Sequence, residues 1–155
     1  MQTRTLLAGS ALMALLAGCA SSGSQSGTDT SASQSVQSNE VTYKGSLPCR
    51  NCSAIDLTVD LKGSEDAASS EARSFTLDAA YRDHPQNPPA EHYQGSWDVL
   101  SGTQSDPQAT VYELTPNGEG QVYYFQKIDP STLELIDPQL RRFENGQNLQ
   151  LKRQP

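Results

Sequence analysis

The chain has 155 residues, with 11 basic and 18 acidic side chains and a formal net charge of −7. This length allows one domain, or two at most. The acidic balance argues against nucleic acid binding, which needs clustered Lys and Arg for the phosphates. Only 35% of the residues are hydrophobic, and they are unevenly distributed, so we expect one part of the chain to fold around a core and another part not to.

Residues 1–18 have the features of an export signal. One charge, Arg4, precedes an apolar run at 6–16, which is shorter than the ~20 residues of a membrane-spanning helix. The run ends in Leu16-Ala17-Gly18-Cys19, which resembles the bacterial lipobox; an ordinary secretory signal that ends in cysteine is the alternative. The resemblance implies cleavage before Cys19, a diacylglycerol on its thiol, and an acyl chain such as palmitate on the new amino terminus.

Residues 19–40 are predicted to be a lipidated cysteine followed by a flexible tether. The stretch 20–40 holds eight serines and one sizeable apolar residue, Val36, so it cannot bury a core. Fully extended, it reaches about 70 Å. No aspartate directly follows Cys19, which by resemblance to lipoprotein sorting implies export by the lipoprotein machinery and a lipid-anchored position at the periplasmic face of the outer membrane.

Residues 41–155 are predicted to form one all-β domain. Apolar and polar residues alternate along this part, as in Ile55, Leu57, Val59 and Leu61, and this period of two indicates strands with one buried face. No segment shows a convincing helical period. The expected strands lie at 41–47, 55–62, 75–81, 93–99, 110–114, 121–128, 132–136 and around 149–151.

Turn-forming sequences separate these segments. Pro116-Asn117-Gly118 predicts a hairpin turn, Asn145-Gly146 precedes the last expected strand, and 63–73 and 83–92 are expected loops. About eight sequential strands predict an antiparallel meander closed into a small β-barrel, with a two-sheet sandwich as the alternative. The interior of such a barrel is filled by side chains or holds one small ligand.

Cys49 and Cys52 are the most informative pair in this domain. Their spacing suits a structural disulfide, a redox couple, or two soft sulfur ligands for Cu(I). In the oxidising periplasm we expect the disulfide. Zinc needs four ligands, and no second cysteine pair completes such a set. A redox enzyme usually places its thiolate at a helix N-terminus, whereas this pair leads into an expected strand.

Other chemistry-bearing residues favour plain roles. His84 and His92 lie in or near a Pro-rich loop and are expected at the surface, while Asp56 and Asp60 fall on the polar face of one strand. No catalytic Ser-His-Asp or metal motif is present, so we predict that the protein is not an enzyme and requires no cofactor, with copper as a candidate ligand.

One segment carries a family resemblance. Tyr43-x-Gly45-x-Leu47-Pro48-Cys49-x-x-Cys52, supported by Gly95-Ser96-Trp97, Tyr123-Tyr124 and the strand at 133–136, resembles the N-terminal domain of the NlpE lipoproteins of copper resistance and envelope stress. The similarity spans roughly residues 41–153. It implies a barrel that is lipocalin-like in shape and a sensor of surface adhesion, lipoprotein trafficking faults or copper, acting on an inner-membrane Cpx-type sensor kinase. Longer members add a second domain with another cysteine pair.

Three functions therefore stay open: a sensor or adaptor that acts by protein contact, a copper-binding protein that uses Cys49 and Cys52, and a lipocalin-like carrier of a small ligand. For the carrier, the residues that would line a cavity are Tyr93, Trp97, Tyr123, Tyr124 and Phe125, although in a barrel of this size such residues more often form a solid core.

Charge is unevenly distributed along the domain. Residues 56–119 hold twelve acids and three basic residues, whereas 129–155 hold four of each. The basic residues near the end are Arg141, Arg142, Lys152 and Arg153, and they are expected to form a solvated rim, with an acidic partner or lipid headgroups as the alternative.

Overall fold

The computed structural model describes residues 39–155. The expected signal peptide at 1–18, the lipidation site Cys19 and nearly all of the tether lie outside the described residues. The described part holds eight strands and two short 3-10 helices: β1 (Glu40–Leu47), β2 (Ala54–Lys62), η1 (Ser70–Ala72), β3 (Ser74–Arg82), β4 (Glu91–Ser101), β5 (Thr110–Pro116), β6 (Tyr123–Asp129), β7 (Thr132–Ile136), η2 (Gly146–Leu149) and β8 (Gln150–Arg153).

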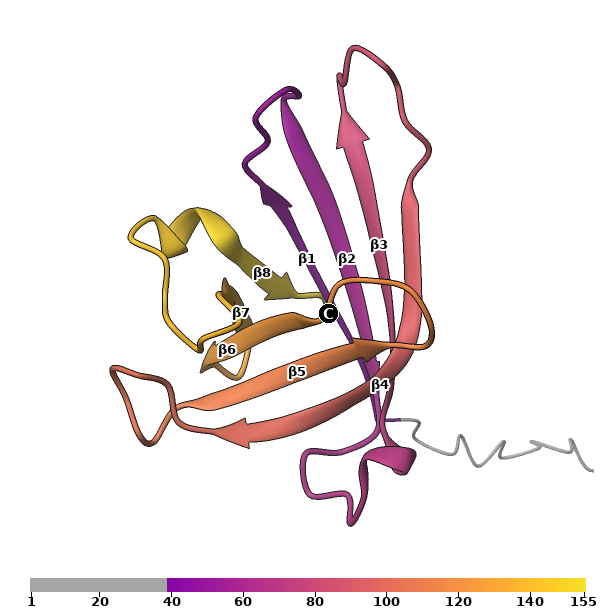
Figure 1. Ribbon diagram of the computed structural model, residues 1–155. Helices are drawn as coiled ribbons and strands as arrows, with labels where there is room; N and C mark the ends of the chain where they lie inside the picture. The colour runs from indigo at the N-terminus through magenta and orange to yellow at the C-terminus, as the bar shows by residue number, and fades with distance from the viewer. Residues whose placement is uncertain (1–38) are drawn as a thin grey trace, which may run out of the picture. The chain divides into compact units, whose positions relative to one another are not determined.

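The strands form a closed antiparallel barrel in which each pairs with the next and β8 pairs with β1 (Figure 1). The predicted meander barrel is therefore confirmed, and the two-sheet sandwich is wrong. No helix within residues 39–155 has the length and apolar character needed to cross a membrane.

Period-two patterning builds the core, as predicted. The inward side chains of β2 and β3 meet across the register pairs Val59↔Leu77 and Leu61↔Phe75, all four at most 4% exposed. Further round the barrel Leu114, Phe125, Leu133 and Leu151 are fully buried. Large apolar side chains therefore fill the middle of the barrel.

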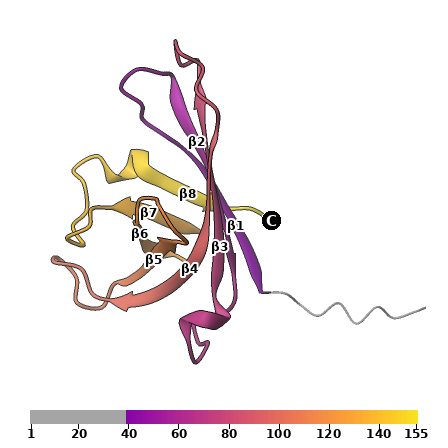
Figure 2. The same ribbon diagram turned by 45° about the vertical axis from the view of Figure 1, so that its right-hand side comes forward.

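Gly95 lies where the pairing of β4 with β3 gives way to its pairing with β5. Residues 91–96 of β4 pair with β3, and residues 95–101 pair with β5. Figure 2 shows β4 curving away from β3 to run beside β5, while the loops after β1 and β3 project at the top. A Cβ on Gly95 would lie 2.0 Å from the backbone oxygen of Thr115, so only glycine permits this close approach.

Most expected strand boundaries agree with the structure to within two residues. β6 begins at Tyr123 rather than 121, because its pairing with β5 begins at Leu114↔Tyr123. The expected last strand is displaced, since Leu149 ends η2 and β8 follows it.

The two expected loops are also modified. The 63–73 loop contains η1, and its last residue, Arg73, is buried. The Arg73 guanidinium lies 5.3 Å from the Trp97 ring centroid and donates hydrogen bonds to the backbone oxygens of Ser64 and Ala67. The other loop is shorter than expected because β4 already begins at Glu91.

Candidate functional site

The cysteine pair lies at the tip of the first hairpin. β1 and β2 pair as far as Leu47↔Ile55, and the connecting loop at 48–53 carries both cysteines. The structure joins Cys49 and Cys52 by a disulfide, with a Cα–Cα distance of 5.3 Å. A ring this small stabilises the fold by about 2 kcal/mol in the chain-entropy account. Between the half-buried cysteines, Arg50 and Asn51 are exposed.

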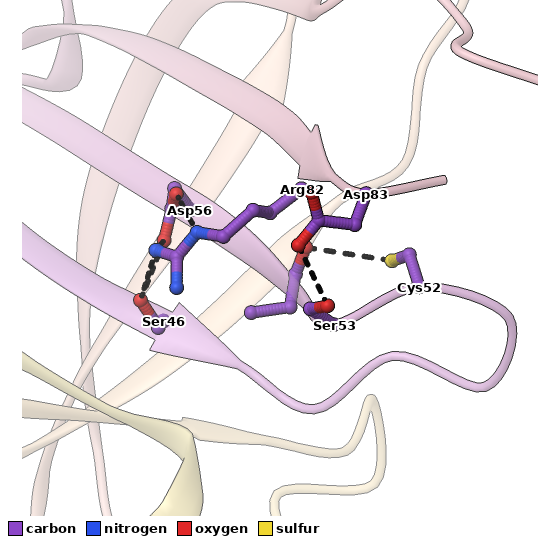
Figure 3. Close-up of polar contacts among 7 residues, drawn as sticks. Ser46, Cys52, Ser53, Asp56, Arg82 and Asp83 are labelled. Carbon is purple, nitrogen blue, oxygen red and sulfur yellow. Dashed lines mark hydrogen bonds and ion pairs between the residues drawn. The ribbon is translucent and has the colours of Figure 1, made fainter. Parts of the chain in front are cut away.

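Hydrogen bonds tie this loop to the end of β3 (Figure 3). The Ser53 backbone N–H donates to the Arg82 carbonyl at 2.9 Å, and the Ser53 hydroxyl donates to Asp83 Oδ2 at 2.8 Å. Cys52 Sγ lies 3.4 Å from the Ala54 backbone oxygen. The loop is therefore held at both its disulfide and its return into β2.

An ion pair fixes the outer face beneath the loop. Arg82 Nε donates to Asp56 Oδ2 at 3.1 Å, and the Ser46 hydroxyl donates to Asp56 Oδ1 at 2.5 Å (Figure 3). The Arg82 and Ser46 hydrogen bonds lower the pKa of Asp56 below its ordinary value. The three side chains come from three adjacent strands, so they brace β1, β2 and β3 together at the tip.

The two histidines do not join the cysteines in a metal site. His92 is the second residue of β4 and its Nδ1 lies 2.5 Å from Asp78 Oδ1, while His84 stands edge-on to Tyr81 with ring centroids 5.9 Å apart. Within residues 39–155 no group of three or more His, Cys, Asp or Glu side chains is placed to hold a metal ion. The described residues therefore bring no further ligand to the two cysteine sulfurs, which are joined as a disulfide, whereas a zinc site needs four ligands.

The two acids of β2 lie on its polar face, as expected. Asp60 accepts hydrogen bonds from Thr42 and Thr76, and Asp56 accepts them from Arg82 and Ser46. Hydroxyl and guanidinium donors thus satisfy both carboxylates.

The aromatic residues weighed for a ligand cavity separate into different environments. Phe125 is fully buried, and Tyr93 and Tyr123 pack against the core with ring centroids 6.3 Å apart. A hollow of about 730 Å³ does exist at the end of the barrel where β1 begins, and of the five aromatic residues Trp97 alone lines it.

Sequence reasoning missed a buried carboxylate on β7. Glu134 is 0% exposed; Arg142 Nε and an Nη donate to its two oxygens at 2.7 and 2.9 Å, and Gln150 donates at 3.1 Å. Burial alone would raise the pKa of Glu134, but these hydrogen bonds lower it below its ordinary value. The only sequence signal was an acid inside a short apolar strand.

Of the four basic residues near the end of the chain, two form ion pairs in the described structure and two do not. Arg142 binds Glu134, and Arg141 lies 2.7 Å from Asp137. Lys152 and Arg153, on β8, form no ion pair within residues 39–155. The expected solvated rim is therefore partly a structural ion-pair network.

Comparison with known proteins gives one match. Neither the curated proteins nor the solved structures contain a significant match to the chain. The family model for the NlpE N-terminal domain matches residues 43–145, about two thirds of the chain, and this span includes the later part of β1, the Cys49–Cys52 loop and β2 to β7. The sequence motif, the closed barrel and this match together place the chain in the NlpE family, in the region of its N-terminal domain.

Proposed function

We propose that the chain is a lipid-anchored envelope lipoprotein that reports envelope stress by protein contact, with an inner-membrane Cpx-type sensor kinase as its partner. NlpE family membership supports a role related to envelope stress or copper. The proposal assigns the protein a binding surface and no catalytic residue. Adhesion, lipoprotein trafficking faults and copper are the conditions that it would report.

The position of the hairpin tip carries this proposal. The chain enters the barrel at Glu40, and β1 runs eight residues from there to Leu47 beside the disulfide loop. Eight strand residues span about 26 Å. An anchor at Cys19 would therefore hold the entry end of β1 toward the membrane, while the exposed Arg50 and Asn51 lie at the opposite end, where a partner has access.

In this proposal the signal is the membrane in which the lipid anchor of the protein lies. Export places the anchor at Cys19 in the outer membrane, whereas failed export leaves it in the inner membrane beside the kinase. Twenty-one residues separate Cys19 from Val41, and a flexible tether of that length has a root-mean-square span of roughly 25 Å. The barrel would then stay close to the kinase, at a high effective concentration.

Retaining the protein in the inner membrane should switch the pathway on. Ala20→Asp places an aspartate directly after Cys19, which the sorting resemblance identifies as a retention signal. In cells that lack the native copy, we expect this variant to raise a transcriptional reporter of the kinase several-fold above the unaltered chain at equal expression. Ala20→Ser is the matched control and should leave the reporter unchanged.

The same background tests the tip as the contact surface. Adding Arg50→Glu and Asn51→Glu to Ala20→Asp should return the reporter toward its basal level, because both side chains are exposed and outside the barrel core. An Ala20→Asp protein that is retained in the inner membrane and leaves the reporter at its basal level would overturn the sensor proposal.

Copper binding is the second candidate, favoured by the two adjacent sulfurs of Cys49 and Cys52. Two-electron, two-proton reduction of the disulfide gives two thiols, and their thiolate forms are the soft ligands that Cu(I) prefers. Bound copper would supply the signal itself, and the chain would supply two sulfurs on a hairpin braced at its base by Ser53 and Asp56.

Anaerobic titration of Cu(I) against a competing chelator tests this candidate. The chemically reduced chain should bind one Cu(I) per molecule tightly, and the Cys49→Ser/Cys52→Ser double variant should lose that binding. His92→Gln is the control, because His92 is engaged with Asp78, and its affinity should be unchanged. Equal, weak binding by the parent and the double variant would leave the pair a structural disulfide only.

A further inference from the structure

The hollow at the end of the barrel opposite the cysteine loop has the features of a ligand site. It encloses about 730 Å³, within the range of small-molecule sites in proteins. Residues from the start of β1, the end of β2, the 63–65 loop and β4, β5, β6 and β8 converge on it. A smaller hollow of about 360 Å³ adjoins it, sharing Glu40, Val41 and Arg153.

The floor of the hollow limits the size of an occupant. Leu61 and Trp97 line it and are only 4% and 2% exposed, and beneath them the core residues Phe75 and Phe125 are at most 2% exposed. Because buried core side chains fill the middle of the barrel, the apolar part of an occupant rests on this floor. A short alkyl or aromatic group can rest against Val41, Leu61, Trp97 and Pro130.

Two donors face the hollow without a partner. The Tyr43 hydroxyl has no hydrogen-bond partner within residues 39–155, although Tyr43 is only 4% exposed. Arg153, its register partner on β8, lines the same hollow and forms no ion pair in that part of the chain. Burial raises the pKa of Tyr43, and Arg153 is the nearby charge that opposes this rise most strongly. The hydroxyl therefore remains a neutral donor at neutral pH, close to a free cation.

Neighbouring donors already hold a carboxylate that belongs to the chain. Glu65, from the loop after β2, accepts a hydrogen bond from the Tyr112 hydroxyl at 2.5 Å and pairs with Lys127. All three residues line the hollow. This arrangement is a built-in example of how tyrosine hydroxyls and a cation at this end of the barrel bind an anion.

One cation that lines the hollow has no acidic partner in the described part of the chain and is available to a second anion. The acids of the hollow are engaged, Glu65 with Lys127 and Glu40 with Lys62. Asp129, which is near enough to influence Tyr43, accepts hydrogen bonds from the Ser131 N–H and hydroxyl. Among the charged residues of the hollow in the described part of the chain, Arg153 alone lacks a counter-ion.

We infer that this hollow binds a small amphiphilic carboxylate, with the anionic head on Arg153 and the Tyr43 hydroxyl and a short apolar group against Leu61 and Trp97. A charge-assisted hydrogen bond to Arg153 gives the strongest contact, and the apolar floor favours an anion that carries a hydrocarbon group over a purely polar one. The site is independent of the cysteine loop and of the proposed contact with a kinase.

Octanoate is a suitable probe, because it joins a carboxylate to a short alkyl chain. The chain contains a single tryptophan, and because Trp97 lines the hollow, its fluorescence reports binding there. The protein is the chain from residue 19 with Cys19→Ser, which keeps the whole closed barrel and carries no acyl group. We expect saturable one-to-one binding by calorimetry with a matching change in Trp97 emission. Octanol, which lacks the charge, should bind at least tenfold more weakly.

Variants of the two donors locate the head group. Arg153→Gln should weaken octanoate binding about tenfold and Tyr43→Phe about fivefold, the usual effects of losing a charged and a neutral hydrogen bond. Glu65→Gln should tighten binding severalfold, because it removes the negative charge that acts most strongly on Tyr43. Arg141→Gln, whose partner Asp137 lies outside the hollow, is the control and should change nothing.

Two outcomes of the ligand comparison would overturn the inference. One is the absence of saturable octanoate binding by the parent chain. The other is equal affinity for octanol and octanoate, which would mean that the protein does not recognise the anionic head group. This comparison uses the parent chain alone. An Arg153→Gln variant that melts at the parent temperature and binds octanoate with parental affinity would likewise exclude Arg153 as the anion-binding residue.

Discussion

Replacing Gly95 with alanine is expected to lower the free energy of unfolding by about 3 kcal/mol, at the upper end of the usual cost of overpacking. The new Cβ would lie 2.0 Å from the Thr115 carbonyl oxygen, and 2.9 Å from both Phe75 Cε1 and Pro116 Cα. Two of these atoms are backbone, so a side-chain rotation cannot relieve the overlap. β4 and β5 would have to separate at the point where β4 leaves β3.

Urea denaturation monitored by Trp97 fluorescence measures this effect, because Trp97 lies two residues along β4 and is 2% exposed. Ser96→Ala, at the adjacent and only half-buried position, is the control and should cost less than about 0.5 kcal/mol. A Gly95→Ala protein with the parent midpoint and slope would mean that the two strands can separate here without cost.

Replacing Arg142 with methionine should cost about 3 kcal/mol at pH 7. Glu134 is 0% exposed and would retain its charge with only Gln150 as a hydrogen-bond donor. Breaking a buried ion pair from one side leaves an uncompensated charge, which is the expensive case. Arg141→Met is the matched control: it removes an ion pair in which the Arg141 side chain is 55% exposed, and such pairs contribute ~0.5 kcal/mol.

The difference in stability between the parent and Arg142→Met should depend on pH, and the direction of that dependence follows from the pKa of Glu134. The pKa of Glu134 is lowered in the folded parent, so the carboxylate stabilises the fold above its unfolded pKa of about 4.3, and that contribution is lost as the pH falls through the lowered value. In Arg142→Met, burial without the guanidinium should raise this pKa, so the variant regains stability relative to the parent on acidification. Denaturation at pH 7 and pH 4 should therefore show a smaller difference at pH 4.

Local sequence patterns were sufficient for most of the fold. The alternation in β2, for example, is a property of nine consecutive residues, and its partner β3 follows after one loop. Neighbouring hairpins then assemble in chain order, which is why the meander could be predicted. The cysteine loop was recognisable for the same reason, since its two sulfurs are separated by three positions.

Features that depend on distant residues could not be predicted. Tyr43 and Arg153 become neighbours only when β8 closes on β1, and no pattern in either segment indicates the other. Nothing in the strand at 132–136 indicates that Glu134 is buried, because the chain that covers it comes later, at 137–146, with Arg142 and Gly146 against its carboxylate. Arg73 was part of an expected loop, and it is buried because its guanidinium stacks on Trp97.

The seam between β1 and β8 has a consequence for the order of folding. It consists of two register pairs, Tyr43↔Arg153 and Lys44↔Lys152, whereas β2 and β3 share nine. Closing the seam brings the two ends of the domain together, which costs chain entropy and gains few hydrogen bonds. This step is therefore expected late in folding. We expect the β1–β2–β3 meander to form first and β8 to dock last. In hydrogen exchange, the amides of β8 should accordingly open before those of β2.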